Sequence, residues 1–271
     1  MDRRDHEVAV ITGAASGIGF AIAQALARDG MRLVITSRSD TRGAAAEQAL
    51  QAAGAEVQFV RCDVGQESDV AALMERTVAR FGRIDALVNN AGPNGDDFIV
   101  GPVHQLPSDA FERAVRIGSF GPFWCCKYAL PHMTAAGGGA IVTISAVTAM
   151  RAVRHLGGYA LSKSMLDTLS RQIAEDYGAS NIRSNTLLVG TIRPESGDIS
   201  TLPEGFDTSA IDAAVARTTM AGRLGRYSEV ADAARFLLSP ASSFITGASI
   251  PVDGGAGAKL LYPDYADAMP E

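Results

Sequence analysis

Apolar runs of strand length alternate with helix-length segments along almost the whole chain. Each run is apolar at successive positions, whereas a strand with one solvent-facing side alternates apolar and polar residues. Strands that are apolar on both sides belong to a parallel sheet covered by helices on both faces. The sequence therefore predicts an α/β fold with a single doubly wound parallel sheet of about seven strands. The candidate strands are residues 8–12, 33–36, 57–60, 86–89, 141–145, 186–189 and 249–252.

Glycines mark where the predicted helices end. A helix over residues 18–29 runs into Gly30, and the next helix runs into Gly54. An apolar period of about 3.6 residues predicts a third helix over 70–81. Residues 194–220 are the least regular stretch, so we expect an irregular substrate lid there, and a tail from residue 256. The whole chain, 1–271, is expected to form a single domain.

Composition limits the partners of this chain. A net charge of −6 argues against nucleic acid as a partner, because proteins that bind phosphate backbones concentrate basic residues, so we expect a small-molecule substrate. The three cysteines, Cys62, Cys125 and Cys126, are too few for a disulfide framework or a metal site, and are expected to be buried thiols in the cytoplasm. Residues 8–27 carry no charge, but their glycines favour a strand, a turn and a helix over a membrane span.

A glycine cluster follows the first predicted strand and opens the first predicted helix. It reads Thr12-Gly13-Ala14-Ala15-Ser16-Gly17-Ile18-Gly19. A pyrophosphate needs backbone N–H groups at a helix N-terminus with no side chain in the way, which closely spaced glycines provide. For an isolated cluster, an ordinary tight turn is the alternative. The position between strand and helix favours a dinucleotide site formed by Gly13, Ser16, Gly17, Ile18 and Gly19.

Tyr159 and Lys163 are four residues apart, so they share one face if the segment is helical. A free phenol titrates at about pH 10, and a neighbouring ammonium favours the phenolate. The pairing would therefore bring the pKa of the phenol toward neutral pH, where proton exchange is efficient. A surface tyrosine and a solvated lysine are the alternative for an isolated pair.

Further motifs follow the glycine cluster in a fixed order. They are Asp63-Val64, Asn89-Asn90-Ala91-Gly92, Tyr159-Ala160-Leu161-Ser162-Lys163, Ile182-Arg183-Ser184-Asn185, Gly225-Arg226, Ile245-Thr246-Gly247 and Val252-Asp253-Gly254-Gly255. Over residues 7–257 the chain resembles the short-chain dehydrogenase/reductase family. The resemblance implies a Rossmann-like NAD(P)-binding domain with Tyr159 and Lys163 as catalytic residues. It further implies that Asp63, Val64, Asn90, Tyr159, Lys163 and Ile192 contact the cofactor.

Two usual polar partners of the family's active centre are missing. The family serine that binds the substrate oxygen lies thirteen residues before the tyrosine, where this chain has Ala146. The family asparagine that supports a proton-relaying water corresponds to Gly118. Ser145 is adjacent to Ala146, but successive strand side chains point to opposite faces, so it should not substitute. Thr148 or His155 are the candidates for a replacement donor.

Cofactor choice is expected to favour NADP, although NAD remains possible. Where family members that use NAD have an acidic residue after the second strand, this chain has Ser37 and Arg38. A hydroxyl and a guanidinium suit a 2′-phosphate, whereas a carboxylate repels it.

The resemblance also implies a homo-oligomer, a tetramer or a dimer. The helix with Phe123, Trp124, Cys125 and Tyr128 and the helix over 159–177 would form one interface, and the last strand and the tail a second.

Two functions remain open. The first is an oxidoreductase that interconverts a carbonyl and an alcohol, or reduces a C=N or an activated C=C bond. The second is a cofactor-binding relative that has lost redox turnover and acts as a scaffold or a non-redox catalyst. The glycines, Tyr159 and Lys163 favour the first function, whereas Ala146 and Gly118 favour the second.

Overall fold

The structure is a computed structural model that describes residues 4, 6–193 and 208–259. One sheet of seven parallel strands has the order β3-β2-β1-β4-β5-β6-β7. The order reverses between β1 and β4, and the crevice for a ligand in such sheets lies at this switch point, beyond the carboxyl ends of the strands. The strands are β1 Val8–Ile11, β2 Arg32–Ser37, β3 Val57–Arg61, β4 Ala86–Asn89, β5 Gly139–Ala146, β6 Ile182–Val189 and β7 Ser249–Val252.

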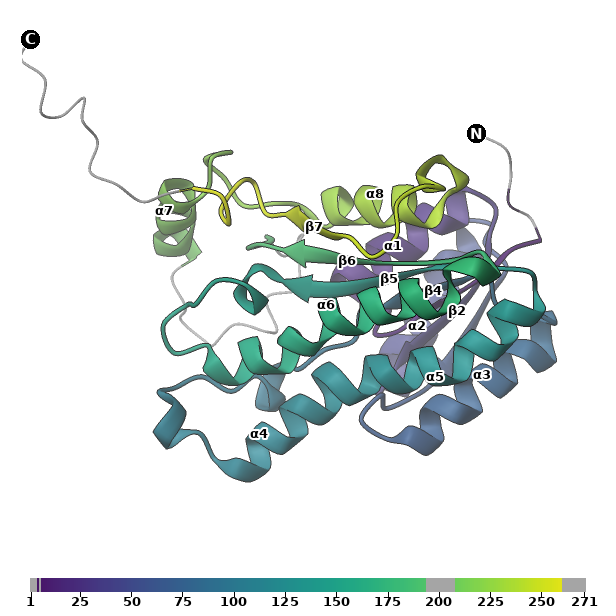
Figure 1. The fold of residues 1–271 in the computed structure, drawn as a ribbon, viewed down its shortest axis with the longest axis horizontal. Helices are drawn as coiled ribbons and strands as arrows, with labels where there is room; N and C mark the ends of the chain where they lie inside the picture. The colour runs from purple at the N-terminus through teal and green to yellow at the C-terminus, as the bar shows by residue number, and fades with distance from the viewer. Residues whose placement is uncertain (1–3, 5, 194–207, 260–271) are drawn as a thin grey trace, which may run out of the picture.

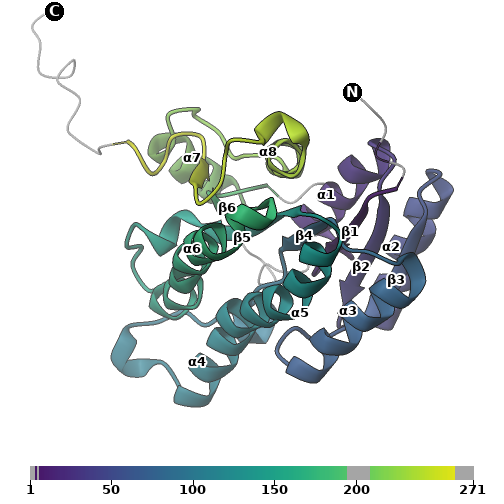
Figure 2. The ribbon, with the colours of Figure 1, turned by 45° about the vertical axis from the view of Figure 1, so that its right-hand side comes forward.

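Helices cover both faces of the sheet, which gives two separate hydrophobic cores (Figures 1 and 2). Helices α1, α2 and α8 pack on one face, and α3, α5 and α6 pack on the other. The predicted doubly wound α/β fold is therefore confirmed. The helices are α1 Gly17–Arg28, α2 Asp40–Ala52, α3 Glu67–Phe81, α4 Ser108–Val115, α5 Gly121–Ala135, α6 Gly157–Tyr177, α7 Thr208–Thr218 and α8 Tyr227–Leu238.

Strand β6 begins four residues earlier than the sequence predicted. Its first half contains Arg183, Ser184 and Asn185, whose polarity concealed it, yet Ser184 and Asn185 are fully buried. Each polar group has a partner: Ser184 Oγ lies 2.9 Å from Ser170 Oγ, and Asn185 Nδ2 donates to the Ile245 carbonyl at 2.8 Å. Burial of polar side chains in a strand is possible because these hydrogen bonds offset the lost hydration.

The expected irregular lid over 194–220 is wrong for its second part. Residues 208–218 form helix α7, in which four alanines supply high helix propensity. Residues 194–207 lie outside the described residues, as does the tail beyond residue 259. The predicted helix ends are confirmed, since Gly30, Gly54 and Gly82 have φ angles of 88°, 87° and 78°.

The three cysteines are buried free thiols, as expected. Burial raises the pKa of Cys62 and of Cys126 to about 12, which keeps both thiols protonated and poorly nucleophilic. Among the described residues, no helix is long and apolar enough to span a membrane.

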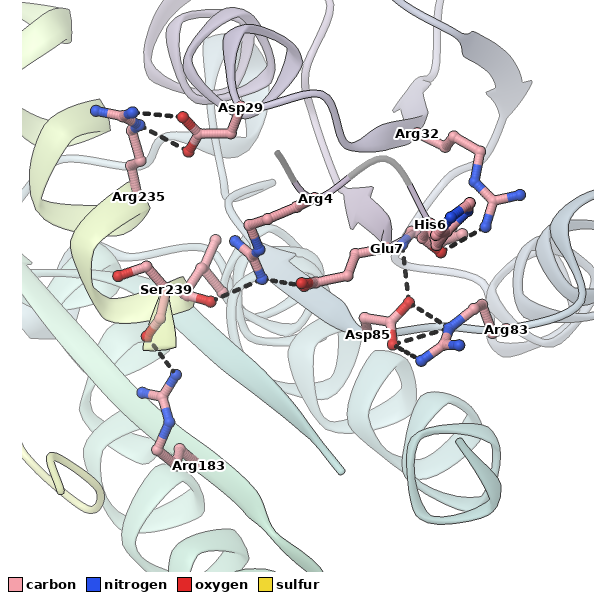
Figure 3. Close-up of polar contacts among 12 residues, drawn as sticks. Arg4, His6, Glu7, Asp29, Arg32, Arg83, Asp85, Arg183, Arg235 and Ser239 are labelled. Carbon is pink, nitrogen blue, oxygen red and sulfur yellow. Dashed lines mark hydrogen bonds and ion pairs between the residues drawn. The ribbon is translucent and has the colours of Figure 1, made fainter. Parts of the chain in front are cut away.

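A pocket of about 360 Å³ lies at the opposite end of the sheet from the switch point, beside the first residues of β1, β4, β5 and β6. Here Arg4 and Arg183 donate to the last carbonyls of α8, those of Leu238 and Leu237, at 3.0 and 2.7 Å. Arg183 also donates to the Ser239 carbonyl at 3.1 Å (Figure 3). Cations are favourable at a helix C-terminus. Arg4 Nε and Nη1 are buried and have no hydrogen-bond partner among the described residues. We therefore interpret Arg4 and Arg183 as structural residues, which attach the N-terminal segment and β6 to the end of α8.

Candidate active site

The glycine loop lies at the end of β1, where the chain turns into α1. Gly13 and Gly17 have φ angles of 64° and 59°, which side chains with a Cβ rarely adopt. Gly19 faces the loop itself, and a Cβ on it would lie 2.6 Å from the Gly13 carbonyl oxygen. The first turn of α1 therefore presents backbone without side-chain obstruction, which is the cradle that an anionic pyrophosphate requires.

A pocket of about 290 Å³ opens above this loop. Nine of the predicted cofactor residues line it: Gly13, Ser16, Gly17, Ile18, Ser37, Arg38, Asp63, Val64 and Asn90. The pocket thus combines a glycine cradle with a basic end beyond β2. These two features suit the pyrophosphate and the adenosine end of a dinucleotide.

Asn90 supports the glycine loop from the side of β4. Its Nδ2 donates to the carbonyls of Thr12 and Gly13 at 2.9 and 3.0 Å, and its backbone N–H donates to Thr12 Oγ1 at 3.0 Å. In this structure the Asn90 amide therefore fixes the loop that would hold the cofactor.

Two pocket residues were not found by sequence reasoning. Arg42 lies in the first turn of α2, four residues after Arg38, and this short separation along the chain was the available signal. Tyr227 comes from α8, and a Cβ on Gly17 would lie 3.6 Å from its ring, so it flanks the glycine loop. No local sequence signal connects Tyr227 with a loop two hundred residues earlier.

Ile192 lies apart from this pocket. It forms an isolated parallel bridge with Gly225 and lines a separate cavity with Gly225 and Asp253. The structure therefore does not bring it to the glycine loop with the other predicted residues.

Lys163 lies directly behind the pocket wall. A Cβ on Gly92, which lines the pocket, would lie 3.0 Å from Lys163 Nζ. The side chain is buried, and Nζ donates to the Ile144 carbonyl at the end of β5 at 2.9 Å. Burial lowers the pKa of Lys163 to about 8, because the ammonium loses its hydration.

Tyr159 lies in the first turn of α6, with its ring 5.0 Å from that of Phe98 between centroids. Lys163 Nζ is 5.9 Å from the centre of the tyrosine ring. Burial raises the pKa of Tyr159 to about 12. The expected lowering by the ammonium is therefore wrong for this structure, since Nζ is engaged by Ile144 and desolvation of the phenolate dominates.

The position of the missing asparagine is closely packed. Gly118 lies in a π-helical turn, Arg116–Phe120, a feature frequent at functional sites. A Cβ on Gly118 would lie 2.8 Å from Ser162 Oγ and 3.1 Å from the Ser162 carbonyl oxygen. An asparagine would fit here only if α6 moved. The present position of α6 therefore requires a glycine at residue 118.

Hydroxyl groups surround the position of the missing serine. Ala146 is the last residue of β5 and is buried. Thr148 Oγ1 and Ser145 Oγ are buried and have no hydrogen-bond partner among the described residues. His155 is exposed and has a left-handed backbone, with φ of 68°. Of Thr148 and His155, Thr148 is therefore the better candidate for the replacement donor, because its hydroxyl has no other hydrogen-bond partner among the described residues.

Comparison with known proteins agrees with this geometry. The family profile described as "Enoyl-(Acyl carrier protein) reductase" matches residues 13–257. The chain is 40% identical over 253 residues to cis-4-hydroxycyclohexanecarboxylate dehydrogenase of Sinomonas cyclohexanicum, which covers 92% of this chain and 96% of the relative. It is 32% identical over 258 residues to 7alpha-hydroxysteroid dehydrogenase of Escherichia coli, covering 95% and 97%.

Among solved structures, a gluconate 5-dehydrogenase from Burkholderia cenocepacia in complex with NADP and tartrate superposes with a TM-score of 0.85. It shares 30% identity and covers 95% of this chain and 98% of its own. A single sheet with a glycine cradle at its switch point, and a Tyr-Lys pair beside it, defines a dinucleotide-binding α/β protein. The protein belongs to the short-chain dehydrogenase/reductase family.

Proposed function

We propose that this protein is an NAD(P)-dependent oxidoreductase that interconverts a carbonyl and an alcohol on a small molecule. The observation that carries the proposal is the position of Lys163, whose Nζ would lie 3.0 Å from a Cβ on the pocket-lining Gly92, on the same helix as Tyr159. This arrangement puts an acid/base pair beside the site where a dinucleotide fits. Two relatives with named substrates, the hydroxycyclohexanecarboxylate and hydroxysteroid enzymes, are dehydrogenases, which supports the same reaction type.

The chemistry of the protein's own residues follows from their protonation states. A bound nicotinamide supplies the carbon that accepts or donates the hydride. With a pKa of about 12, Tyr159 is protonated at neutral pH and donates a proton from Oη to a carbonyl oxygen. With a pKa of about 8, Lys163 is mostly an ammonium at pH 7, and its Nζ lies 5.9 Å from the centre of the Tyr159 ring.

We propose NADP as the preferred cofactor, although NAD remains possible. Ser37, Arg38 and Arg42 all line the end of the pocket beyond β2, where no carboxylate of β2 opposes them. Two guanidiniums and a hydroxyl are suited to a 2′-phosphate. Among the structural relatives, two are in complex with NADP or NADPH and one is in complex with NADH.

We further propose that the substrate has an apolar body and a negative charge. Loop 98–103 joins loop 150–156 beside Tyr159, since the Gly101 N–H donates to the His155 carbonyl at 2.8 Å. This rim combines exposed Met150 and Val153 with Arg151 and Arg154, which have no ion pair within the described part of the chain. A relative's substrate, a hydroxycyclohexanecarboxylate, has the same combination.

With NADPH, 4-oxocyclohexanecarboxylate is expected to have a KM about tenfold lower than 4-methylcyclohexanone, as one charge-assisted contact would provide. The double variant Arg151→Gln, Arg154→Gln should lose this preference, whereas Arg171→Gln on the outside of α6 should keep it. Steady-state assays of NADPH consumption measure both. Equal KM values for the two ketones would contradict the proposed charge.

The second candidate is a relative without redox turnover, which Ala146 and Gly118 favour. The same assay separates the two functions when it is extended to ketones, iminium compounds and conjugated enones. Binding of NADPH without its consumption across the panel would support the second candidate.

We also propose a symmetric oligomer, a tetramer or a dimer. Four large apolar side chains on the face of α5 and α6 are exposed in the single chain. They are Phe120, Phe123, Leu161 and Met165. Patches of this kind mark interfaces between subunits. Light scattering at micromolar concentration should give at least twice the 28.3 kDa mass of one chain, and a monomer alone would contradict the proposal.

A further inference from the structure

Arg38 is already held by residues on the far side of the pocket. Its Nη1 donates to Asp97 Oδ2 at 2.9 Å, and its Nη2 donates to Asn94 Oδ1 at 3.1 Å. Arg38 follows β2, whereas Asn94 and Asp97 lie in the loop after β4. Because β1 lies between β2 and β4, these contacts cross above the end of the strand that carries the glycine loop.

Asp97 is the charge that balances Arg38 at this position. Its side chain is 13% exposed, whereas that of Arg38 is 47% exposed. Asp97 Oδ1 also lies 3.7 Å from Nε of Arg113 on α4. The carboxylate thus lies between two guanidiniums. Because Arg113 would still attract it, we expect the carboxylate to stay in place when Arg38 moves.

The same short segment contacts the catalytic helix. Phe98, the residue after Asp97, packs on the Tyr159 ring, and Ile99 packs on Gly158 so closely that a Cβ there would lie 2.6 Å from Ile99 Cγ1. Loop 94–99 is therefore anchored at one end by Arg38 and at the other by the first turn of α6. This anchoring keeps Asp97 within reach of Arg38.

A cofactor with a 2′-phosphate needs the guanidinium that Asp97 now occupies. Arg38 has its two terminal nitrogens engaged, so a phosphate must displace the carboxylate or bind beside it and be repelled. A cofactor with free ribose hydroxyls meets no such competition. Asp97 thus opposes the preference that Ser37, Arg38 and Arg42 would otherwise give.

We propose that Asp97, assisted by Asn94, is a positioning residue that sets cofactor preference by competing with the 2′-phosphate of NADP for Arg38. The proposal rests on the proposed function, because it assumes that the pocket binds a nicotinamide dinucleotide. It implies that this protein discriminates between NADP and NAD less strongly than its basic residues alone would predict.

The test compares two nucleotides that differ only in the group concerned, adenosine 2′,5′-bisphosphate and 5′-AMP, by isothermal titration calorimetry without substrate. Asp97→Asn should bind the bisphosphate about fivefold more tightly, as loss of one partly exposed ion pair allows, and leave 5′-AMP unchanged. Asp97→Glu, which keeps the carboxylate, should return the bisphosphate affinity toward that of the native protein. The gain in Asp97→Asn should shrink as salt is raised.

Asp96→Asn is the matched control, since it removes an equal charge from the adjacent, exposed residue without a contact to Arg38. Equal gains in Asp96→Asn and Asp97→Asn would overturn the proposal, because they would show a general charge effect. Unchanged bisphosphate affinity in Asp97→Asn, with both nucleotides bound, would overturn it and leave the proposed function intact. Failure of the native protein to bind either nucleotide would overturn both.

Discussion

Tyr159→Phe is expected to reduce the native redox reaction by at least about a thousandfold, within the range that general acid catalysis contributes. The substitution removes only the phenol oxygen, and the ring can still pack on Phe98. Without Oη, Lys163 is the remaining titratable group of α6 beside the pocket wall, among the described residues. Its Nζ donates to the Ile144 carbonyl instead. The carbonyl oxygen would then lack a proton donor.

The measurement is turnover of NADPH under saturating conditions, together with NADPH binding by fluorescence. Binding should change little, because Oη forms no wall of the glycine-loop pocket. Tyr177→Phe, at the last position of the same helix, is the matched control and should keep full turnover. If Tyr159→Phe left the native reaction untouched, the pair would serve only to hold the cofactor, and the oxidoreductase proposal would have to be abandoned.

The elevated pKa of Tyr159 also gives this reaction a direction in pH. A group with a pKa of about 12 is a proton donor throughout the neutral range, so reduction of a carbonyl has its acid in place. Oxidation of an alcohol needs the phenolate. At pH values below that pKa, the phenolate population rises about tenfold with each unit of increase in pH. The fold therefore favours reduction near pH 7 and oxidation at alkaline pH.

Sequence reasoning reached the features that depend on local backbone chemistry. The run 86–89 corresponds to β4, and the run 8–12 contains β1, because a strand buried on both faces has to be apolar at successive positions. Gly13 and Gly17 were identified because closely spaced glycines between a strand and a helix leave the backbone N–H groups unobstructed. These signals need no knowledge of the rest of the chain.

Features that depend on tertiary partners were missed. The polar start of β6 is a strand only because Ser170 and Ile245 satisfy Ser184 and Asn185. Lys163 was expected to act on Tyr159, but the Ile144 carbonyl competes for its ammonium, and no motif records that contact. The bond between Arg38 and Asp97 joins residues 59 positions apart, so the sequence showed a phosphate site without its competitor.

Ala146→Ser is expected to raise reduction of simple ketones by about a hundredfold, because a second hydrogen bond to a developing oxyanion contributes about 2.7 to 4 kcal/mol in comparable sites. Ala146 ends β5, in register with Val189, and lies one residue before the turn that carries Thr148. The change adds one oxygen atom at the position where the family resemblance implies a serine donor. Cofactor affinity should stay the same, since Ala146 does not line the glycine-loop pocket.

The gain depends on whether Thr148 already donates to the substrate oxygen. Thr148 Oγ1 has no partner among the described residues, so a substrate oxygen could become its acceptor. In that case Thr148→Val would reduce turnover by about a hundredfold. Ala146→Ser would then add little to the native protein, but it would restore turnover when combined with Thr148→Val.

Ser145→Ala, which removes a buried hydroxyl from the adjacent strand position, serves as the control for each variant and should leave turnover unchanged. If neither Ala146→Ser nor Thr148→Val changed kcat with a simple ketone, oxyanion stabilisation by this segment would be excluded, and a substrate carrying its own polarisation, such as an iminium or a conjugated enone, would become the better candidate.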